Sequence, residues 1–227
     1  MADLVISAPA PVLVPVAGGG FFPVRRVYCV GRNYAEHVRE MGNDLREPPF
    51  FFSKPADAVV TDGASIAYPP QTADFHHEIE LVVAIGRDGI DIAEREALDH
   101  VFGYAAGLDM TRRDLQTEAK KAGRPWTMAK GFDQSAPIGT IAPASVIGHP
   151  SRGAITLSVN GGERQRGDLA EQIWSVPETI AFLSRLVTLR AGDLIMTGTP
   201  SGVGAVRPRD VLEGVIEGVG AVSTVIA

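Results

Sequence analysis

Three carboxylates have the types and spacing of a metal site. Glu78 and Glu80 are two residues apart in an apolar, β-branched stretch that continues to Ile85, so on a strand both side chains project from the same face. Two like charges on one face repel each other unless a cation lies between them. Asp109 closes a second apolar segment, residues 101–108, and offers a third oxygen. This all-oxygen set suits Mg²⁺ or Mn²⁺ better than Zn²⁺; the alternative is a solvated edge strand with an alternating acidic face.

Cationic and amide side chains near these carboxylates are candidates for binding an anionic substrate. Arg113 and Gln116 share one face of a helix that should begin just after the third carboxylate. Lys54 follows an aromatic strand and Lys130 follows residues 126–129, so both ammonium groups can enter the same cavity. Arg32 is a further candidate. Three carboxylates and one divalent ion carry a net charge of about −1, so an anionic substrate needs such cations. Taken singly, the arginine and the amide also fit a solvated surface.

Histidines supply a candidate general base. His37 and Glu40 are three residues apart in residues 33–41, which we expect to be helical, so they share a face. A carboxylate that orients an imidazole leaves its other nitrogen free to take a proton from water; an exposed intrahelical pair is the alternative. His76 and His77 are adjacent on an expected strand and face opposite ways, so at most one approaches the metal directly. For them we favour support of the ligands or a place in the core.

A glycine-rich run near the end of the chain is a candidate anion-binding loop. Gly198, Gly202 and Gly204 follow an expected strand, but no Lys-Ser/Thr pair follows them and Pro208 interrupts the place where a phosphate-binding helix would start. The run is therefore not a P-loop. A tight loop whose N–H groups and Thr199 hydroxyl hold a carboxylate is the better interpretation, and a plain strand connection is the alternative.

Composition limits the classes of partner. The chain has 227 residues, 45% of them hydrophobic, and can bury the core of one large domain. A net charge of −6 without a basic block argues against nucleic acid or an anionic membrane as the main partner. The single cysteine, Cys29, cannot form an internal disulfide, which is consistent with a reducing cytoplasm. Prolines interrupt the apolar N-terminal stretch, so we expect neither a signal peptide nor a spanning helix there.

Local patterns predict many short strands and few helices. Asn160-Gly161 should turn a hairpin. Thr111 and Asp114 have capping-box spacing at the start of a helix. We expect helices at 33–41, 111–122 and 176–189, and strands at 12–16, 24–30, 50–52, 155–159, 193–196, 211–216 and 221–226. The expected fold class is α+β, a mixed or antiparallel β-roll with few helices. We expect one domain, residues 26–227, preceded by a lead-in strand segment, residues 1–25.

Several of these motifs occur in an order that resembles the fumarylacetoacetate hydrolase family, and in particular its short members, the acylpyruvate and fumarylpyruvate hydrolases. The resemblance rests on residues 30–37, 52–55, 76–81, 103–104, 109–116, 130 and 197–204. It implies the β-roll of that family's C-terminal domain, usually as a homodimer. It also implies that Glu78, Glu80 and Asp109 bind Mg²⁺ or Mn²⁺.

The resemblance further implies a reaction. His37 with Glu40 matches the family's water-activating pair, and Lys130 matches its catalytic lysine. With Thr199 and Gln116 fixing the acid end, the expected activity is metal-dependent hydrolysis of the C–C bond of a 3-acylpyruvate, in the first place fumarylpyruvate to fumarate and pyruvate. The alternatives are an oxaloacetate decarboxylase, or an isomerase or decarboxylase of aromatic-degradation intermediates. A keto-acid-binding protein without activity is the non-enzyme alternative.

Overall fold

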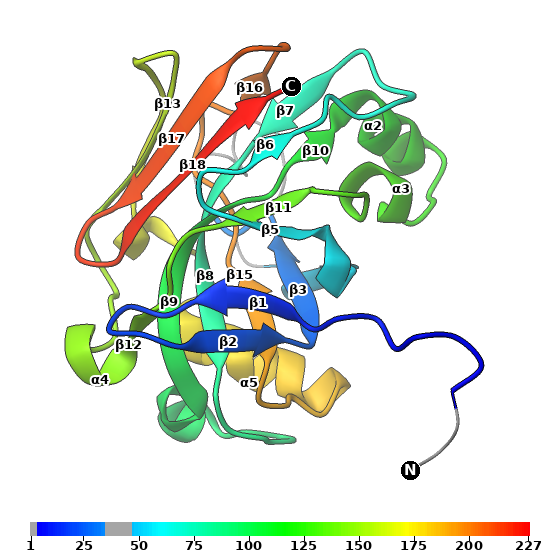
Figure 1. Ribbon diagram of the computed structural model, residues 1–227. Coiled ribbons are helices and arrows are strands. Elements are labelled where there is room, and N and C mark those ends of the chain that lie inside the picture. The colour runs from blue at the N-terminus through cyan, green and yellow to red at the C-terminus, as the bar shows by residue number, and fades with distance from the viewer. Residues whose placement is uncertain (1–3, 35–46) are drawn as a thin grey trace.

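Strands are the predominant regular secondary structure of the computed structural model, which describes residues 4–34 and 47–227. The largest sheet has the order β4-β3-β15-β8-β9-β11-β5, with β12 paired to β9 (Figure 1). Its strands are β3 (Arg26–Gly31), β4 (Phe50–Lys54), β5 (Val59–Thr61), β8 (Ile79–Ile85), β9 (Val101–Leu108), β11 (Ala136–Ile138), β12 (Ala142–Pro143) and β15 (Asp193–Met196). Its pairs are mixed, since β15 runs parallel to β3 and antiparallel to β8.

A second sheet packs against the first and has the order β14-β13-β17-β18-β6. Its strands are β6 (Ser65–Ile66), β13 (Ala154–Val159), β14 (Gly162–Asp168), β17 (Val211–Ile216) and β18 (Gly220–Ile226). The smaller sheets are β10-β7-β16, formed by β7 (Phe75–His77), β10 (Thr111–Arg112) and β16 (Gly204–Ala205), and the hairpin of β1 (Val12–Pro15) and β2 (Phe21–Val24).

The burial pattern explains how the two large sheets pack. Every residue of β8 is buried, as in a strand covered on both faces, whereas β13 and β17 bury alternate residues. The inward residues of both sheets form one apolar core that includes Leu81, Leu108, Leu157, Leu212 and Val222. This core fixes the ends of β8 and β9, where the candidate metal ligands lie.

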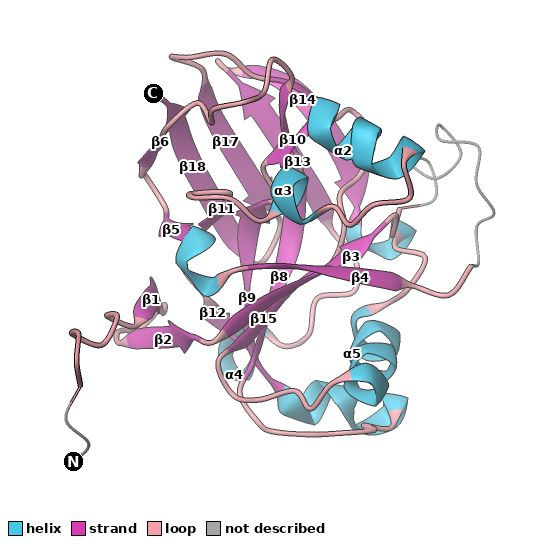
Figure 2. Ribbon diagram, turned by 90° about the vertical axis from the view of Figure 1, so that its right-hand side faces the viewer, coloured by secondary structure: helices cyan, strands magenta, loops and turns pink. Residues whose placement is uncertain are grey.

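The helices among the described residues are short, and α5 (Val176–Leu186) contributes Ile180 and Leu183 to the apolar core. The others are α2 (Arg113–Lys121), α3 (Thr127–Lys130) and α4 (Ala144–Ile147), with 3₁₀ turns η1 (Ala56–Ala58), η2 (Glu94–His100) and η3 (Leu169–Glu171). Both views place α2 and α3 above α5 (Figures 1 and 2). Ser175 and Glu178 form a capping box at the start of α5. No helix among the described residues is long and apolar enough to cross a bilayer.

The α+β fold class, a mixed β-roll with few helices, is confirmed, and strands β15 and β17 have the predicted bounds. The hairpin at Asn160-Gly161 is also confirmed, because both residues have positive φ between paired β13 and β14. The expected strand 24–30 is divided instead between β2 and β3. The separation of the chain into segments 1–25 and 26–227 stays a prediction.

The predicted start of the helix at Thr111 is wrong. Thr111 pairs with His76 in the β10–β7 ladder, so the helix begins at Arg113 without a side-chain cap. Asp114 instead accepts hydrogen bonds from the Thr72 hydroxyl and the Ala73 N–H. A tertiary strand pair has replaced the local capping box.

Helix α5 ends before the predicted residue 189. Its last residue is Leu186, and Leu189 forms an isolated bridge with Gly89. Of the helix expected at 33–41, residues 33 and 34 are not helical, since Tyr34 bridges Gln172. The rest of that segment lies outside the described residues.

Candidate active site

The pairing of β8 with β9 brings the three acidic residues together. In this antiparallel ladder Ile79 lies opposite Leu108, and the Asp109 N–H donates to the Glu78 carbonyl at 2.8 Å. Glu78 precedes β8 and Glu80 lies within it, so Asp109 reaches both from the end of β9. One carboxylate oxygen of each residue lies within 4.8 Å of the others. Their exposed fractions are 5% or less, so three acidic groups share one buried space.

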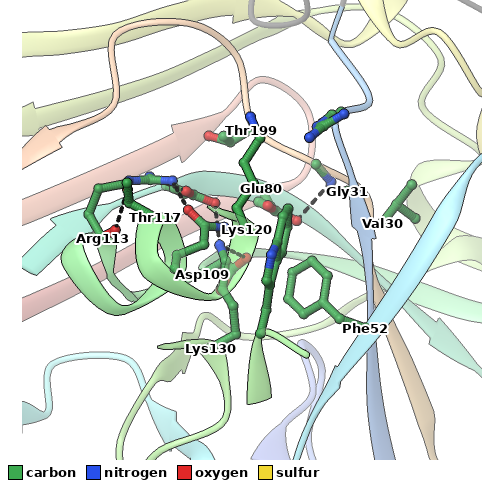
Figure 3. A pocket seen from close by; sticks show the side chains of 15 residues that line it. Val30, Gly31, Phe52, Glu80, Asp109, Arg113, Thr117, Lys120, Lys130 and Thr199 are labelled. Carbon is green, nitrogen blue, oxygen red and sulfur yellow. Dashed lines mark hydrogen bonds and ion pairs between the residues drawn. The ribbon is translucent and has the colours of Figure 1, made fainter. Parts of the chain in front are cut away.

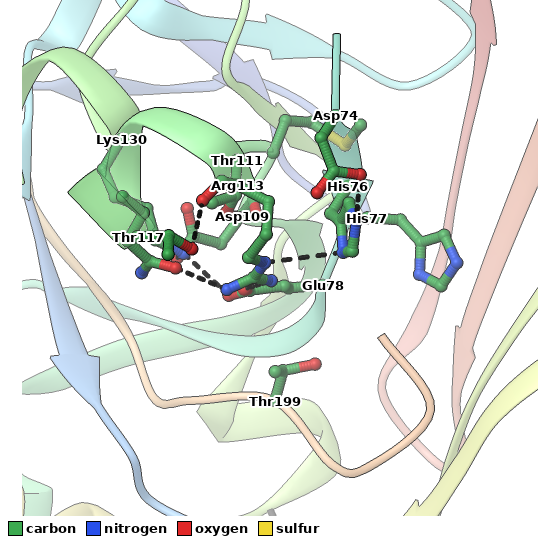
Figure 4. Close-up of polar contacts among 12 residues, drawn as sticks. Asp74, His76, His77, Glu78, Asp109, Thr111, Arg113, Thr117, Lys130 and Thr199 are labelled. Carbon is green, nitrogen blue, oxygen red and sulfur yellow. Dashed lines mark hydrogen bonds and ion pairs between the residues drawn. The ribbon is translucent and has the colours of Figure 1, made fainter. Parts of the chain in front are cut away.

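Three cationic side chains neutralise this acidic group. The Lys130 ammonium donates to Glu78 Oε2 at 2.7 Å and to Asp109 Oδ2 at 2.6 Å. Lys54 Nζ lies 2.8 Å from Asp109 Oδ1. The Arg113 guanidinium donates to Glu78 Oε1 (Figure 4). The three positive charges balance the three negative ones, so an added divalent ion would give the site a net positive charge.

The pKa values of the two glutamates are shifted in opposite directions. Burial disfavours the charged form of Glu78, but the Lys130 ammonium and the Arg113 guanidinium outweigh burial and lower the pKa of Glu78. Glu80 accepts a hydrogen bond from the Gly198 N–H at 2.7 Å. Nevertheless, burial and the charges of its two acidic neighbours raise the pKa of Glu80 well above its ordinary value.

The donor set fits a hard divalent cation. A metal ion between Glu80 and the other two carboxylates would remove the repulsion that raises the Glu80 pKa. Carboxylate oxygens are also the donors that Mg²⁺ and Mn²⁺ prefer. No cysteine or histidine belongs to this acidic group among the described residues. The predicted ligands Glu78, Glu80 and Asp109 are therefore the residues able to hold such an ion.

A cavity of ≈ 190 Å³ opens beside the acidic group (Figure 3). Of the residues predicted to bind substrate or take part in the reaction, five line it: Arg32, Arg113, Gln116, Lys130 and Thr199. Lys54 is not among the lining residues, because its ammonium contacts Asp109 and the carbonyl oxygens of Met110 and Lys130. This placement favours a role in holding Asp109 rather than in binding substrate. His37 and Glu40 lie outside the described residues.

Helix α2 supplies one wall of the cavity. Arg113 Nη1 donates to Gln116 Oε1, so the amide NH₂ of Gln116 remains available to a ligand. Thr117 and Lys120 also line the cavity. Both were missed, although the spacing of Arg113, Gln116, Thr117 and Lys120 is that of one helical face. That spacing was the available signal.

The two histidines support other residues instead of joining the acidic group. His76 Nδ1 accepts a hydrogen bond from Arg113 Nε at 3.4 Å, and His76 Nε2 lies 2.7 Å from Asp74 Oδ1 (Figure 4). His77 points to the other side of β7, where its Nδ1 lies 2.9 Å from Gln165 Oε1. The placement agrees with the supporting role favoured for this pair.

Aromatic side chains close another part of the cavity. Trp126 and Phe52 both line it, and their ring centroids are 5.8 Å apart. Trp126 also meets Phe50 edge-on at 5.2 Å. Trp126 therefore packs against both phenylalanines, and its ring also borders the cavity. Sequence reasoning missed Phe52 because no local pattern distinguishes a core aromatic from a cavity wall.

The fold and the site define a β-roll protein with a buried acidic group able to hold a metal ion beside a polar cavity. The model described as "Fumarylacetoacetate (FAA) hydrolase C-terminal" matches residues 26–227. The chain belongs to this family, as the resemblance predicted.

Relatives named for different activities match this chain. The chain is similar to the fumarylpyruvate hydrolase from Pseudomonas aeruginosa, whose structure contains Mn²⁺ and pyruvate, with 55% identity, a TM-score of 0.97 and coverage of 99% of each chain. It is 45% identical over 195 residues to the mitochondrial oxaloacetate tautomerase from Rattus norvegicus, covering 86% of this chain and 88% of the relative. It is 43% identical over 190 residues to the mitochondrial oxaloacetate decarboxylase from Dictyostelium discoideum, covering 83% and 87%.

Proposed function

We propose that this protein is a Mg²⁺- or Mn²⁺-dependent hydrolase of 3-acylpyruvates, with fumarylpyruvate as the preferred substrate. The observation that carries the proposal is the Lys130 ammonium, which lies between Glu78 and Asp109 at the base of the cavity. In the proposed reaction this cation also stabilises the negative charge that develops on the pyruvate fragment. The 55% identity to a fumarylpyruvate hydrolase supports the choice of substrate.

The chain's own residues supply most of the chemistry. Thr199 and Gln116 bind the carboxylate of the pyruvoyl end through the hydroxyl and amide groups that face the cavity. His37, oriented by Glu40, takes a proton from water, and the water oxygen forms a bond to the distal acyl carbon. The C–C bond then breaks, its electron pair moves to the pyruvate fragment, and the resulting enolate is protonated to pyruvate. Lys130 stabilises the enolate charge, and a divalent ion, when bound, supplies Lewis-acid stabilisation.

Two cations favour a substrate with a second carboxylate. Arg32 and Lys120 both line the cavity, and within the described residues neither forms an ion pair with a carboxylate. Arg32 has a left-handed backbone with φ of 60°, and its buried Nε lacks a hydrogen-bond partner in the described part of the chain. The distal carboxylate of fumarylpyruvate would pair with these two groups. An acylpyruvate with an uncharged acyl group, such as acetylpyruvate, would leave them unused.

Oxaloacetate chemistry is the second candidate function. The relatives from Rattus norvegicus and Dictyostelium discoideum are named as an oxaloacetate tautomerase and an oxaloacetate decarboxylase. Loss of CO₂ or enolisation uses the same enolate stabilisation by Lys130 but needs no attacking water. The same cavity can therefore serve both reactions, and the position of the water-activating pair decides between them.

The test is a substrate panel. Fumarylpyruvate, acetylpyruvate and oxaloacetate are each incubated with Mn²⁺ or Mg²⁺, and the products are identified. Arg32→Met and Lys120→Met should raise the KM for fumarylpyruvate about tenfold, the effect of one lost charge-assisted hydrogen bond, while leaving acetylpyruvate unaffected. Lys121→Met is the matched control, because Lys121 is an exposed lysine of α2 that does not line the cavity. Equal KM changes for both substrates would remove the case for a second carboxylate.

Two further expectations remain proposals. We propose a homodimer, to be tested by light scattering, and a cytoplasmic location, to be tested by cell fractionation. Because two relatives are named as mitochondrial, the location has to be measured directly.

A further inference from the structure

Gln165 is a buried amide in a strand that is otherwise exposed or half-buried. Its exposed fraction is 1%. Leu157 pairs with Gln165 whereas the next residue, Ser158, pairs with Glu163, so Arg164 is an extra residue in β14. Such a bulge shifts the alternation of the strand by one residue. The shift places Gln165 on the same inward face as Leu157.

The hydrogen bonds of this amide have fixed directions. Gln165 Oε1 accepts from the Ile79 N–H at 3.1 Å, and Gln165 Nε2 donates to the Pro200 carbonyl at 2.9 Å. A backbone N–H can only donate and a carbonyl can only accept, so these two bonds settle which end of the amide is oxygen. Gln165 Nε2 must therefore also donate to Thr199 Oγ1, which is 2.8 Å away. Likewise, His77 Nδ1 must carry a hydrogen and donate it in a hydrogen bond to Gln165 Oε1, which lies 2.9 Å away.

This arrangement determines what the Thr199 hydroxyl can do. Because its oxygen accepts a hydrogen bond from Gln165 Nε2, its own hydrogen points in another direction. Within the described part of the chain, no group accepts that hydrogen, and Thr199 lines the cavity. The hydroxyl is thus left as a hydrogen-bond donor toward a bound carboxylate.

We propose that Gln165 is a positioning residue that orients the Thr199 hydroxyl to donate to the carboxylate of a bound 2-oxo acid. Its other bond, to the Ile79 N–H between Glu78 and Glu80, fixes this donor relative to the metal-binding strand. His77 contributes by filling the second acceptor site of the amide oxygen. The inference rests on the proposed function only in the class of ligand, a small 2-oxo acid.

Backbone packing holds the Thr199 loop in place independently of Gln165. A Cβ on Gly167 would lie 2.7 Å from Pro200 Cβ, and a Cβ on Gly202 would lie 2.2 Å from the Arg164 carbonyl oxygen. Strand β14 and the loop therefore meet at two glycines, where no side chain fits. Loss of the Gln165 amide should leave this packing intact and remove only the hydrogen bonds.

The experiment is a double-mutant cycle on ligand affinity. Dissociation constants of pyruvate and oxalate are measured at saturating Mn²⁺ for the wild type, Gln165→Met, Thr199→Val and the double variant. Each single variant should bind pyruvate about tenfold more weakly, the effect of one net hydrogen bond. In the Thr199→Val background, Gln165→Met should add less than about twofold. Equal effects of Gln165→Met in both backgrounds would overturn the proposal.

A second measurement separates positioning from support of the metal strand. Mn²⁺ affinity should stay within about twofold of wild type in Gln165→Met. A fall in Mn²⁺ affinity with unchanged pyruvate affinity at saturating Mn²⁺ would overturn the proposal. The matched control is Arg166→Met, which alters the exposed neighbouring residue of β14 and should change neither constant.

Gln165→Glu keeps the test decisive if Gln165→Met does not fold. A carboxylate cannot donate, so the Thr199 hydroxyl would turn to donate to it, and pyruvate affinity should fall at least as far as in Thr199→Val. Wild-type affinity in Gln165→Glu would contradict the assignment. Turnover of acylpyruvates does not enter any of these readouts. A protein that fails to hydrolyse fumarylpyruvate but follows the cycle would refute the proposed function and leave this inference standing.

Discussion

Replacing Lys130 with Met should lower the thermal stability of the metal-free protein and slow the reaction. The Lys130 side chain is 2% exposed and contacts two buried carboxylates, at 2.7 Å and 2.6 Å. Removing one partner of a buried ion pair costs about 3–5 kcal/mol. Lys54 and Arg113 still neutralise part of the charge, so the low end, about 3 kcal/mol, applies here. At about 2–4 °C per kcal/mol, the melting temperature in EDTA should fall by about 6–12 °C.

Added Mn²⁺ should offset much of this loss, because a divalent cation replaces the missing positive charge. The assay is thermal denaturation of wild type and Lys130→Met in EDTA and in Mn²⁺, with Lys121→Met as an exposed-lysine control. In parallel, the rates of fumarylpyruvate hydrolysis and oxaloacetate decarboxylation should both fall by about 10²–10³-fold, the usual effect of removing one preorganised charge. An unchanged melting temperature in EDTA, or a loss confined to one of the two reactions, would refute the reasoning.

Three further predictions test other parts of the site. His37→Ala and Glu40→Gln should lower hydrolysis by about 10²-fold or more but decarboxylation much less, since loss of CO₂ needs no attacking water; equal losses would mean that the pair does not act as a base. Glu80→Ala should lower Mn²⁺ affinity, measured by calorimetry, at least about tenfold, and unchanged affinity would exclude Glu80 as a ligand. Burial raises the pKa of the Cys29 thiol well above its ordinary value of 9.0, so the thiol stays protonated and iodoacetamide at about pH 8 should label it only after unfolding; rapid labelling of the folded protein would contradict its burial.

The acidic group was predictable from sequence because it depends on local patterns. Two glutamates two residues apart at the start of an apolar strand must share a face, and Asp109 ends the next apolar strand. The structure changes one detail, since Glu78 precedes β8 instead of lying within it. Both carboxylates nevertheless meet Asp109.

Residues that depend on tertiary register were not predictable in the same way. Gln165 faces inward only because a bulge at Arg164 shifts β14, and no sequence pattern in that polar segment indicates a bulge. Thr111 and Asp114 have the spacing of a capping box. Thr111 instead pairs with His76 in a β-ladder, and His76 is distant in sequence. Lys120 was predictable, because its spacing from Arg113 places both residues on one face of the helix.

The most direct test of the central claim is the product analysis of fumarylpyruvate with the purified protein, followed by NMR. We expect equal amounts of fumarate and pyruvate in the presence of Mn²⁺, no turnover after treatment with EDTA, and recovery when Mn²⁺ is restored. Full activity in EDTA would contradict the metal-dependent reading of Glu78, Glu80 and Asp109. Turnover of oxaloacetate without any cleavage of fumarylpyruvate would contradict the proposed hydrolase.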